Sequence, residues 1–531
     1  MKLLYNGTRI TRCHIGGLAF DKDDRLLEGN SLASYLSSAT DFSDFGLRCS
    51  KLNGSWHAVL LSCGFAYLAV DHRATLALYY RIVGNELRVS DNGFDLLLPE
   101  ESSVQPAPKV ELYFSRWGFT PKHLTLHPDI YRLEAGTAIQ ISLTTPHIRV
   151  VTHSPNFTFL PDLAQISYQQ AKELVRERLN KAMHRMARVV GDRPVVLPLT
   201  AGRDSRMIAI GLKQNGIEHS QCISYGRDRK IEDCSTAHRV ASDLDFHHRF
   251  ISSLPPTYGT TGYTEDRSAL RFLRYVSGLG SGYFFAEYLP AMKLAEEFGE
   301  QRRPIILPGH NGDIAGGDNL RYPLFRHKRD LDRMASFLTE HEDGNRTLSR
   351  PEKKLLKAQI REILDSYPSN LSMAAYFETF RNKEISTKYY INSARAWRYF
   401  GLPVWMPFLD REFIDLMHNL PLEYRWGKRI YEEVTDEYYK QNGVCYPTDK
   451  HTFSEIGKPL SRLKTYLRPY LRAYLSRRDR LWLNDAIGFK TLMEGSVLQQ
   501  VQANCNYRPT TANGLSFAWW LLSLKNGQAL L

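Results

Sequence analysis

Residues 195–205 read Val-Val-Leu-Pro-Leu-Thr-Ala-Gly-Arg-Asp-Ser, an apolar run that leads into a turn of small and polar residues. Pro194–Leu199 has the length and composition of a buried strand, and Ser205–Asn215 has apolar residues at helical spacing before Gly216, a typical helix stop. The turn Thr200–Ser205 therefore presents its backbone N–H groups at a helix N-terminus, where the helix dipole favours anions. The stretch predicts a cradle for phosphate groups.

Asp204 adds a carboxylate to this turn. A carboxylate repels phosphate, so its presence indicates a Mg²⁺ ion that lies between the two. The turn is not a Walker P-loop, because the Gly-Lys-Ser/Thr ending is absent. The alternative interpretation is an ordinary turn between a strand and a helix, with no ligand.

The next segments continue a β-α-β-α-β pattern. Gln221–Tyr225 is predicted to be a strand that ends at Gly226, Ile231–Leu244 a helix, and His247–Ser252 a further strand. Such units form parallel sheets, and their ligands lie at the carboxyl ends of the strands. Ser224–Gly226 is therefore expected at the same sheet edge as the phosphate cradle.

A second acidic turn follows about one hundred residues later. Pro304–Pro308 is predicted to be a short strand, and Gly309–Asp318 is a glycine-dense loop that contains Asp313. Two carboxylates from two strand ends fit a Mg²⁺ ion that keeps waters and phosphate oxygens as its other ligands. The alternative is a glycine-rich surface loop without a ligand.

These loops carry a resemblance to a known family. The turn Thr200–Ser205 resembles the Ser-Gly-Gly-x-Asp-Ser pyrophosphate loop of the ATP pyrophosphatase superfamily, with Thr and Ala at the first two positions. Together with Val404-Trp-Met-Pro-Phe-Leu-Asp-Arg411 and Lys428, the order of segments from about residue 165 to 440 resembles the synthetase half of class B asparagine synthetases. The resemblance implies an enzyme that uses ATP and Mg²⁺.

The resemblance also implies roles for particular residues. It implies that Asp204 and Asp313 bind Mg²⁺ and that Lys428 neutralises charge during adenylation and amide formation. The residues that it implies for ATP binding are Leu199, Thr200, Ala201, Gly202, Arg203, Asp204, Ser205, Ser224, Tyr225, Gly226 and Gly309. Without the family pattern, Lys428 would be taken for an ordinary solvated helix lysine.

The first third of the chain contains short β-type runs broken by turns, as in a sandwich. They resemble the glutaminase domain of the same synthetases, which needs a cysteine exposed at the N-terminus as its nucleophile. Position 2 is Lys2, and Cys13 is too far from the start. We therefore expect residues 1–155 to form a degenerate glutaminase-like sandwich of the N-terminal-nucleophile type. Residues 160–531 are expected to form a parallel-sheet ATP pyrophosphatase domain with added helices, so the fold class is α/β.

Two departures from the family concern the acceptor substrate. Asparagine synthetases have Gly-Glu-Gly ahead of the second metal-binding Asp, and the residue that matches the Glu is His310. A neutral imidazole takes up a proton from an ammonium ion near neutral pH, so His310 is either a catalytic base or a packed loop histidine. The residue two before Pro407 is commonly Arg in the family and is Trp405 here, so the acceptor is not assigned to aspartate.

The composition is that of a folded protein, with 531 residues, 43% of them hydrophobic and 24% charged. The start lacks the long apolar segment of a signal peptide, and no stretch is long enough to span a bilayer. Seven cysteines without Cys-x-x-Cys spacing suggest free thiols, so we expect a cytoplasmic protein. The net charge of +12 gathers partly in residues 462–480, which are either a solvated helix or a contact for an anionic polymer or a membrane surface.

The expected function is that of an ATP-dependent carboxylate–amine ligase that forms an acyl-adenylate and then an amide. Its partners are a small-molecule or glycan carboxylate, such as a uronic acid of a surface polysaccharide, and an amine donor; a nucleic-acid partner is not expected. The alternatives are an asparagine synthetase that uses free ammonia, an enzyme like β-lactam synthetases or lasso-peptide cyclases, and a catalytically silent ATP-binding protein. The two substrates and the oligomeric state stay open at this point.

Overall fold

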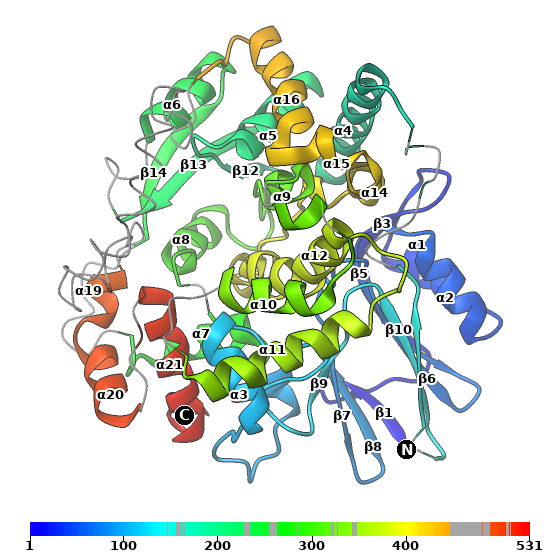
Figure 1. Cartoon of the computed structure of the whole chain (residues 1–531), viewed down its shortest axis with the longest axis vertical. Helices are drawn as coiled ribbons and strands as arrows, with labels where there is room; N and C mark the ends of the chain where they lie inside the picture. Colours follow the sequence, from blue (N-terminus) through cyan, green and yellow to red (C-terminus); the bar gives the residue numbers. More distant parts are fainter. Residues whose placement is uncertain are drawn as a thin grey trace.

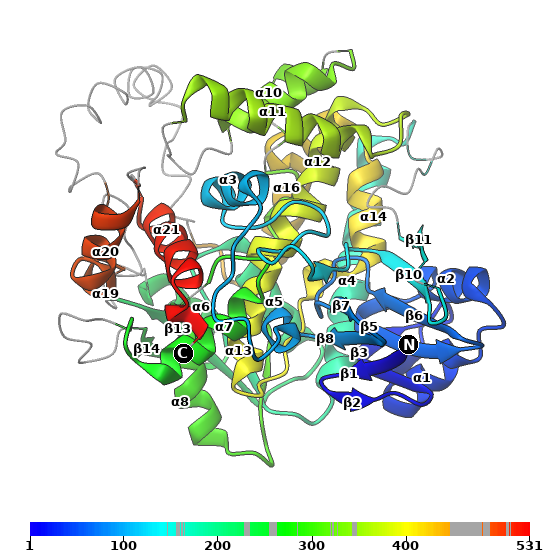
Figure 2. The ribbon, with the colours of Figure 1, turned by 90° about the horizontal axis from the view of Figure 1, so that it is seen from below.

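The computed structural model shows a mixed α/β protein with antiparallel sheets in its N-terminal part and a parallel sheet after them (Figures 1 and 2). The residues that the structure describes are 1–145, 147–154, 160, 163, 165–227, 234–253, 263–283, 285–318, 320, 323–326, 328–341, 348–446, 481, 489–505, 509 and 511–530. Figure 1 shows the parallel sheet in the upper half of the view and the N-terminal sheets at the lower right.

The N-terminal part contains two sheets. The first has the order β2-β1-β8-β7-β9, formed by Thr8–Arg9, Lys2–Tyr5, Glu86–Ser90, Tyr79–Val83 and Tyr131–Arg132. The second has the order β11-β10-β6-β5-β3-β4, formed by Ile148–Thr152, Thr137–Ser142, Phe65–Val70, Asn53–Ser62, Cys13–Phe20 and Leu26–Glu28. The strands pair antiparallel except for β1 and β8, which are parallel.

Alternation along β6 explains the layers of this part. Leu68 and Val70 lie in the core between the two sheets, whereas Tyr67 and Ala69 lie in a second core against the helices α1 (Gly29–Ser37) and α2 (Phe42–Ser50). Successive side chains of a strand point to opposite faces, so a strand that is apolar throughout can serve both cores. The result is a layer of helices over two packed sheets, the sandwich expected from the sequence.

The parallel sheet has the order β14-β13-β12-β15, formed by His247–Ser252, Ser220–Gly226, Val195–Pro198 and Ile305–Ile306. All its strand pairs are parallel. Val404 extends the sheet through a parallel bridge to Ile306. The carboxyl ends of β12, β13 and β15 therefore meet at one edge, and the segment after Val404 leaves from the same edge.

Helices cover this sheet and continue beyond it. The first set is α3 Pro108–Trp117, α4 Tyr168–Val190, α5 Arg203–Gln214, α6 Cys234–Asp243, α7 Arg267–Ser277, α8 Tyr288–Phe298, α9 Gly312–Gly316, α10 Leu331–His341, α11 Arg350–Asp365 and α12 Met373–Phe380. The second set is α13 Arg395–Tyr399, α14 Arg411–Asn419, α15 Leu422–Arg425, α16 Arg429–Gln441, α19 Phe489–Met493, α20 Ser496–Asn504 and α21 Ala512–Lys525. A π-helix, Arg381–Tyr390, follows α12 directly.

Arg185, on α4, joins the N-terminal part to the rest of the chain. Its side chain is 2% exposed, and its guanidinium contacts Asp24 at 2.6 Å, Asp410 at 2.7 Å and Glu412 at 2.5 Å. A buried guanidinium is tolerated because these carboxylates compensate its charge. Helix α21 adds an apolar junction, since its residues share one core with residues of α3 and of α7.

Several local predictions are confirmed, with shifted ends. Helix α5 begins at Arg203 instead of Ser205, because Gly202 has the extended backbone of an N-cap. The strand expected over Pro304–Pro308 is restricted to Ile305–Ile306.

The cysteines are all free thiols, and no helix among the described residues has the length and apolarity needed to cross a membrane. The first residues of the helix expected over Ile231–Leu244, and the whole basic stretch 462–480, lie outside the described residues.

Candidate active site

The turn Thr200–Ser205 connects β12 to α5. Its shape is fixed locally: the Thr200 N–H donates to Ser205 Oγ at 3.1 Å, and the Gly202 N–H donates to Thr200 Oγ1 at 3.0 Å. No side chain caps the first turn of α5. The N–H groups of Arg203, Asp204 and Ser205 have no intrahelical acceptor, because the first N–H groups of a helix never do. The turn thus offers backbone donors to an anion.

Asp204 and Asp313 meet at this turn, although they come from different loops. The Asp313 N–H donates to Asp204 Oδ2 at 2.9 Å, and the Tyr431 hydroxyl donates to Oδ1 at 2.7 Å. Burial, with the charge of Asp313 added, raises the pKa of Asp204 to about 7 despite these two hydrogen bonds. The site therefore concentrates negative charge that a cation would stabilise.

Glycines allow the two loops to approach this closely. A Cβ atom on Gly312 would lie 2.5 Å from Asp204 Cγ, and one on Gly309 would lie 2.8 Å from the Ser205 nitrogen. Gly316 is similarly close to Tyr431, 2.8 Å from its ring. Gly309 and Gly312 are thus required by packing against the turn Thr200–Ser205, and Gly316 by packing against Tyr431.

The pair of carboxylates suits a magnesium ion. No group of three or more His, Cys, Asp or Glu side chains that could hold a metal is found among the described residues. Mg²⁺ in proteins often binds one or two carboxylates and takes waters and substrate phosphates as its other ligands. Asp204 and Asp313 fit this pattern, because their charges are close together and the backbone donors of α5 lie beside them.

Lys428 lies at the start of α16, beside this pair. Its side chain is 14% exposed, and its Nζ is 3.8 Å from Asp318 Oδ1 and 3.5 Å from Glu432 Oε1. Burial dominates the pKa of Asp204, and the positive charge of Lys428 acts in the opposite direction. Its backbone is left-handed, with φ +71°, which turns the chain from η7 (Trp426–Lys428) into α16. The ammonium group thus lies between Asp318, at the end of the glycine-rich loop, and Glu432 of its own helix.

Arg203 and Leu199 lend only backbone atoms to the turn. The Arg203 guanidinium points to α16, where it pairs with Asp436 and lies 5.7 Å from the ring centre of Tyr439. Leu199 is fully buried, and its N–H donates to the carbonyl of Ile223 at 2.8 Å. The carbonyl of Ala201 accepts from Arg206 at 3.0 Å, which stiffens the middle of the turn.

Ser224–Gly226 ends β13 at the same sheet edge. The Ser224 hydroxyl donates to the Leu199 carbonyl at 2.7 Å and lies 2.9 Å from His248 Nε2, so it is engaged within the protein. Tyr225 donates to Glu287 at 3.2 Å. Burial raises the pKa of Glu287 to about 7, and its second oxygen has no hydrogen-bond partner among the described residues. Neither Glu287 nor Tyr431 carries a local sequence signal that could have identified it.

His310 and Trp405 are both on the loops at this edge. Burial lowers the pKa of His310 to about 4, and its Nδ1 has no partner in the described part of the chain. The imidazole is therefore neutral at pH 7 and a weaker base than a histidine of ordinary pKa. Trp405 is 8% exposed, and its ring meets Phe20 edge-on at 6.3 Å, so it packs against the N-terminal part.

The structure thus brings the turn Thr200–Ser205, Asp313 and Lys428 together and sets Ser224–Gly226 on the neighbouring strand. A comparison with models of protein families finds no match, and a comparison with curated proteins finds no significant relative. The functional argument therefore rests on the geometry of these residues.

Proposed function

We propose that this chain is an ATP-dependent carboxylate–amine ligase. In the first step a carboxylate oxygen of the substrate attacks the α-phosphorus of ATP, and pyrophosphate leaves. In the second step the nitrogen of an amine attacks the acyl carbon, the bond to AMP breaks, and the amine loses a proton. The products are an amide, AMP and pyrophosphate.

The observation that carries the proposal is the contact between Asp204 and Asp313 at the uncapped N-terminus of α5. Two carboxylates beside a row of backbone N–H donors would be a costly arrangement if the site bound nothing, because their charges repel. The arrangement makes chemical sense when a cation and a polyphosphate share the site. Lys428 adds the positive charge that an acyl-phosphate centre requires.

Each group has a role in this scheme. The N–H groups of Arg203, Asp204 and Ser205 bind pyrophosphate oxygens, and Asp204 and Asp313 hold Mg²⁺. The bound ion would neutralise charge on the departing pyrophosphate. Lys428 stabilises the negative charge that builds on the oxygens around the α-phosphorus and the acyl carbon. The edge formed by Ser224–Gly226 borders the nucleoside.

The proposal extends to the substrates and to the domains. The carboxylate is proposed to belong to a small molecule or a glycan, with a uronic acid of a surface polysaccharide as the first choice. Residues 1–155 are proposed to be a glutaminase-like domain without glutaminase activity, and residues 160–531 the synthetase domain. The free thiols support a reducing, cytoplasmic setting.

The test is ATP–pyrophosphate exchange with a panel of carboxylates that includes uronic acids and aspartate. We expect exchange with at least one of them, and loss of exchange in Asp204→Asn and in Asp313→Asn. Asp245→Asn is the matched control and should keep full exchange, because Asp245 is exposed in the turn between α6 and β14. ATP binding without exchange on any carboxylate would contradict the proposal and indicate a catalytically silent ATP-binding protein.

A further inference from the structure

The carboxylate of Glu287 lies at the carboxyl edge of the parallel sheet. Glu287 directly precedes α8, whose end at Phe298 leads through a short connection into the start of β15. A helix that joins parallel strands runs back along the sheet, so its beginning lies at the edge where the strands end. Oε1 of Glu287 accepts from the Tyr225 hydroxyl at 3.2 Å, near the end of β13. Glu287 is therefore at the edge where ligands of such sheets bind.

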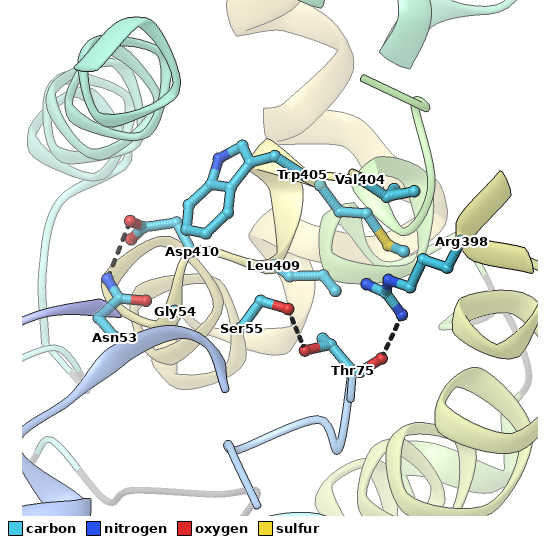
Figure 3. Close-up of a pocket in the computed structure, with 10 residues that line it drawn as sticks. Asn53, Gly54, Ser55, Thr75, Arg398, Val404, Trp405, Leu409 and Asp410 are labelled. Atoms are coloured by element: carbon cyan, nitrogen blue, oxygen red, sulfur yellow. Dashed lines mark hydrogen bonds between the residues drawn. The ribbon is translucent and has the colours of Figure 1, made fainter. Parts of the chain in front are cut away.

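One oxygen of this carboxylate lacks a partner. Glu287 is 8% exposed, and its Oε2 has no hydrogen-bond partner among the described residues. Burial raises its pKa, countered by its own backbone N–H and by Tyr225, with no positive side chain contributing. Asp410, by contrast, is equally buried but accepts from the Asn53 amide at 2.9 Å (Figure 3) and pairs with Arg185 at 2.7 Å. A buried acceptor without a donor is costly, so Glu287 lacks a donor that a ligand would supply.

The π-helix Arg381–Tyr390 connects Glu287 to the glycine-dense loop of the candidate active site. Ser386 of this helix donates to Oδ1 of Asn311, which belongs to that loop. Burial raises the pKa of Tyr389, and the charge of Glu287 adds to the effect, so the Tyr389 hydroxyl lies near this carboxylate. The π-helix thus borders both Glu287 and the loop that carries the second metal-type carboxylate. Irregular helices of this kind are frequent at functional sites.

The surroundings of Glu287 favour an ammonium group over a metal ion as the missing partner. Two tyrosines, Tyr225 and Tyr389, border the carboxylate, and the ring of Tyr225 meets Trp397 edge-on at 5.8 Å. A metal ion needs several oxygen ligands, and the described ranges contain no group of three metal-ligating side chains. An ammonium group donates to a single carboxylate and is attracted by aromatic rings.

We propose that Glu287 binds the ammonium form of the amine substrate and accepts its proton before the amine attacks the acyl-adenylate. This inference rests on the proposed ligase function. The N–H bond breaks, its electron pair stays on the nitrogen, and the proton passes to Oε2 of Glu287. The neutral amine then attacks the acyl carbon, the bond to AMP breaks, and a second proton leaves the nitrogen for water.

The two buried candidates for this proton transfer differ in basicity. Burial raises the pKa of Glu287 to about 7, so its carboxylate is matched to proton uptake near neutral pH. Burial lowers the pKa of His310 to about 4, which makes the imidazole a weaker base. Glu287 thus supplies the proton acceptor that the second step of the ligase reaction requires.

Separate measurement of the two half-reactions at pH 8 tests this role. In Glu287→Gln, ATP–pyrophosphate exchange should be unchanged, because it needs no amine. Amide formation from ammonium chloride or methylammonium chloride should fall by about 10²-fold or more, the usual cost of losing a general base. Hydroxylamine, which is neutral at this pH and captures acyl-adenylates without a base, should still give hydroxamate at the full rate.

Glu111→Gln, at a partly exposed ion pair with Lys525, is the matched control and should keep both half-reactions. The amine that reacts better identifies the source of nitrogen as ammonia or an organic amine, and a selective loss in Glu287→Gln with either one supports the proposal. Exchange and amide formation that fall together in Glu287→Gln would make Glu287 a structural residue and overturn it. Undiminished amide formation would overturn it as well.

A second measurement needs no catalysis. The Tm of the full chain is followed at pH 8 and constant ionic strength, with ammonium, methylammonium and potassium chloride compared. We expect at least one of the two amine salts to raise Tm in a saturable way beyond potassium, because a ligand of the folded state stabilises it by mass action. The difference should persist in Glu111→Gln and vanish in Glu287→Gln.

Equal effects of the three salts, or a difference that survives in Glu287→Gln, would refute ammonium binding at this carboxylate. The two proposals fail separately. Absence of exchange with every carboxylate in the unmodified protein would refute the ligase, whereas the Tm measurement still decides whether Glu287 binds an ammonium ion.

Discussion

The Tyr431 hydroxyl donates a 2.7 Å hydrogen bond to Oδ1 of Asp204, although 227 residues separate the two in sequence. The other oxygen of that carboxylate receives the Asp313 N–H. Both oxygens are thus held in place before any ligand arrives, and each keeps a lone pair for a cation. Tyr431 is a positioning residue in this arrangement, because it acts through Asp204.

The first prediction concerns this hydrogen bond. Tyr431→Phe should weaken Mg²⁺ binding in the presence of ATP by about 10- to 100-fold, the usual cost of losing a group that orients a metal ligand. Isothermal titration calorimetry measures the effect. Tyr438→Phe is the matched control. Tyr438 lies on the same helix as Tyr431, but its hydroxyl donates to Asn180 of α4 instead of to Asp204. Equal Mg²⁺ affinity in the two variants would show that Tyr431 does not position the carboxylate.

The second prediction concerns Lys428. Lys428→Met should lower the rate of adenylation by about 10²–10³-fold, as expected for the loss of one preorganised charge, with little change in ATP affinity. Pyrophosphate release measures the rate, and equilibrium binding measures the affinity. Lys440→Met, at the exposed far end of α16, should be unaffected. A normal rate in Lys428→Met would remove this lysine from the mechanism.

The third prediction follows from the contact between the loops. Gly312→Ala places a Cβ atom 2.5 Å from Asp204 Cγ, so the loops must separate or the backbone must shift. We expect a loss of about 1–3 kcal/mol in the free energy of unfolding. We also expect the carboxylates of Asp204 and Asp313 to be displaced from each other, with no measurable exchange activity. Gly280→Ala is the control, because its Cβ would meet its nearest neighbour at an ordinary 3.6 Å. An active Gly312→Ala enzyme of normal stability would contradict the close approach.

The fourth prediction concerns pH. Burial raises the pKa of Glu287 from its ordinary 4.5 to about 7, so the folded state binds this proton more tightly than the unfolded state. The free energy of unfolding should therefore fall as pH rises from about 4.5 to 7 and then level off. Glu287→Gln should remove this contribution, on the order of 3 kcal/mol.

Denaturant unfolding at pH 5 and pH 8 checks that prediction. The advantage of Glu287→Gln over the unmodified protein should grow between the two pH values. Glu111→Gln, at a partly exposed ion pair with Lys525, should show no comparable growth. A constant difference at both values would mean that Glu287 titrates normally in the folded protein.

The turn Thr200–Ser205 and the parallel strands around it could be predicted from sequence, because their signals are local. An apolar run followed by small residues marks the end of β12, and the period of α5 is visible within a few residues. The exact ends were less accessible, since the extended backbone of Gly202, the N-cap residue that starts α5 at Arg203, is a property of the folded turn. The two carboxylates could be named from sequence, but their contact depends on the glycines between Gly309 and Gly316.

Other parts of the site could not be found this way. Tyr431 is one tyrosine among many, and its role appears only when α16 packs against α5. Glu287 precedes α8 with no pattern around it, and its raised pKa is a result of burial. Long-range packing decides these features, and local patterns do not record it.

The buried guanidinium of Arg185 has an evolutionary consequence. Asp24 belongs to the N-terminal part, and without that part Arg185 would keep Asp410 and Glu412 but lose the third of its carboxylates. Loss of the N-terminal part would therefore disturb the surroundings of Arg185 on α4, in the half of the chain that carries the turn Thr200–Ser205. Natural selection acting on that half alone would preserve the first 155 residues, even after any reaction of their own had disappeared.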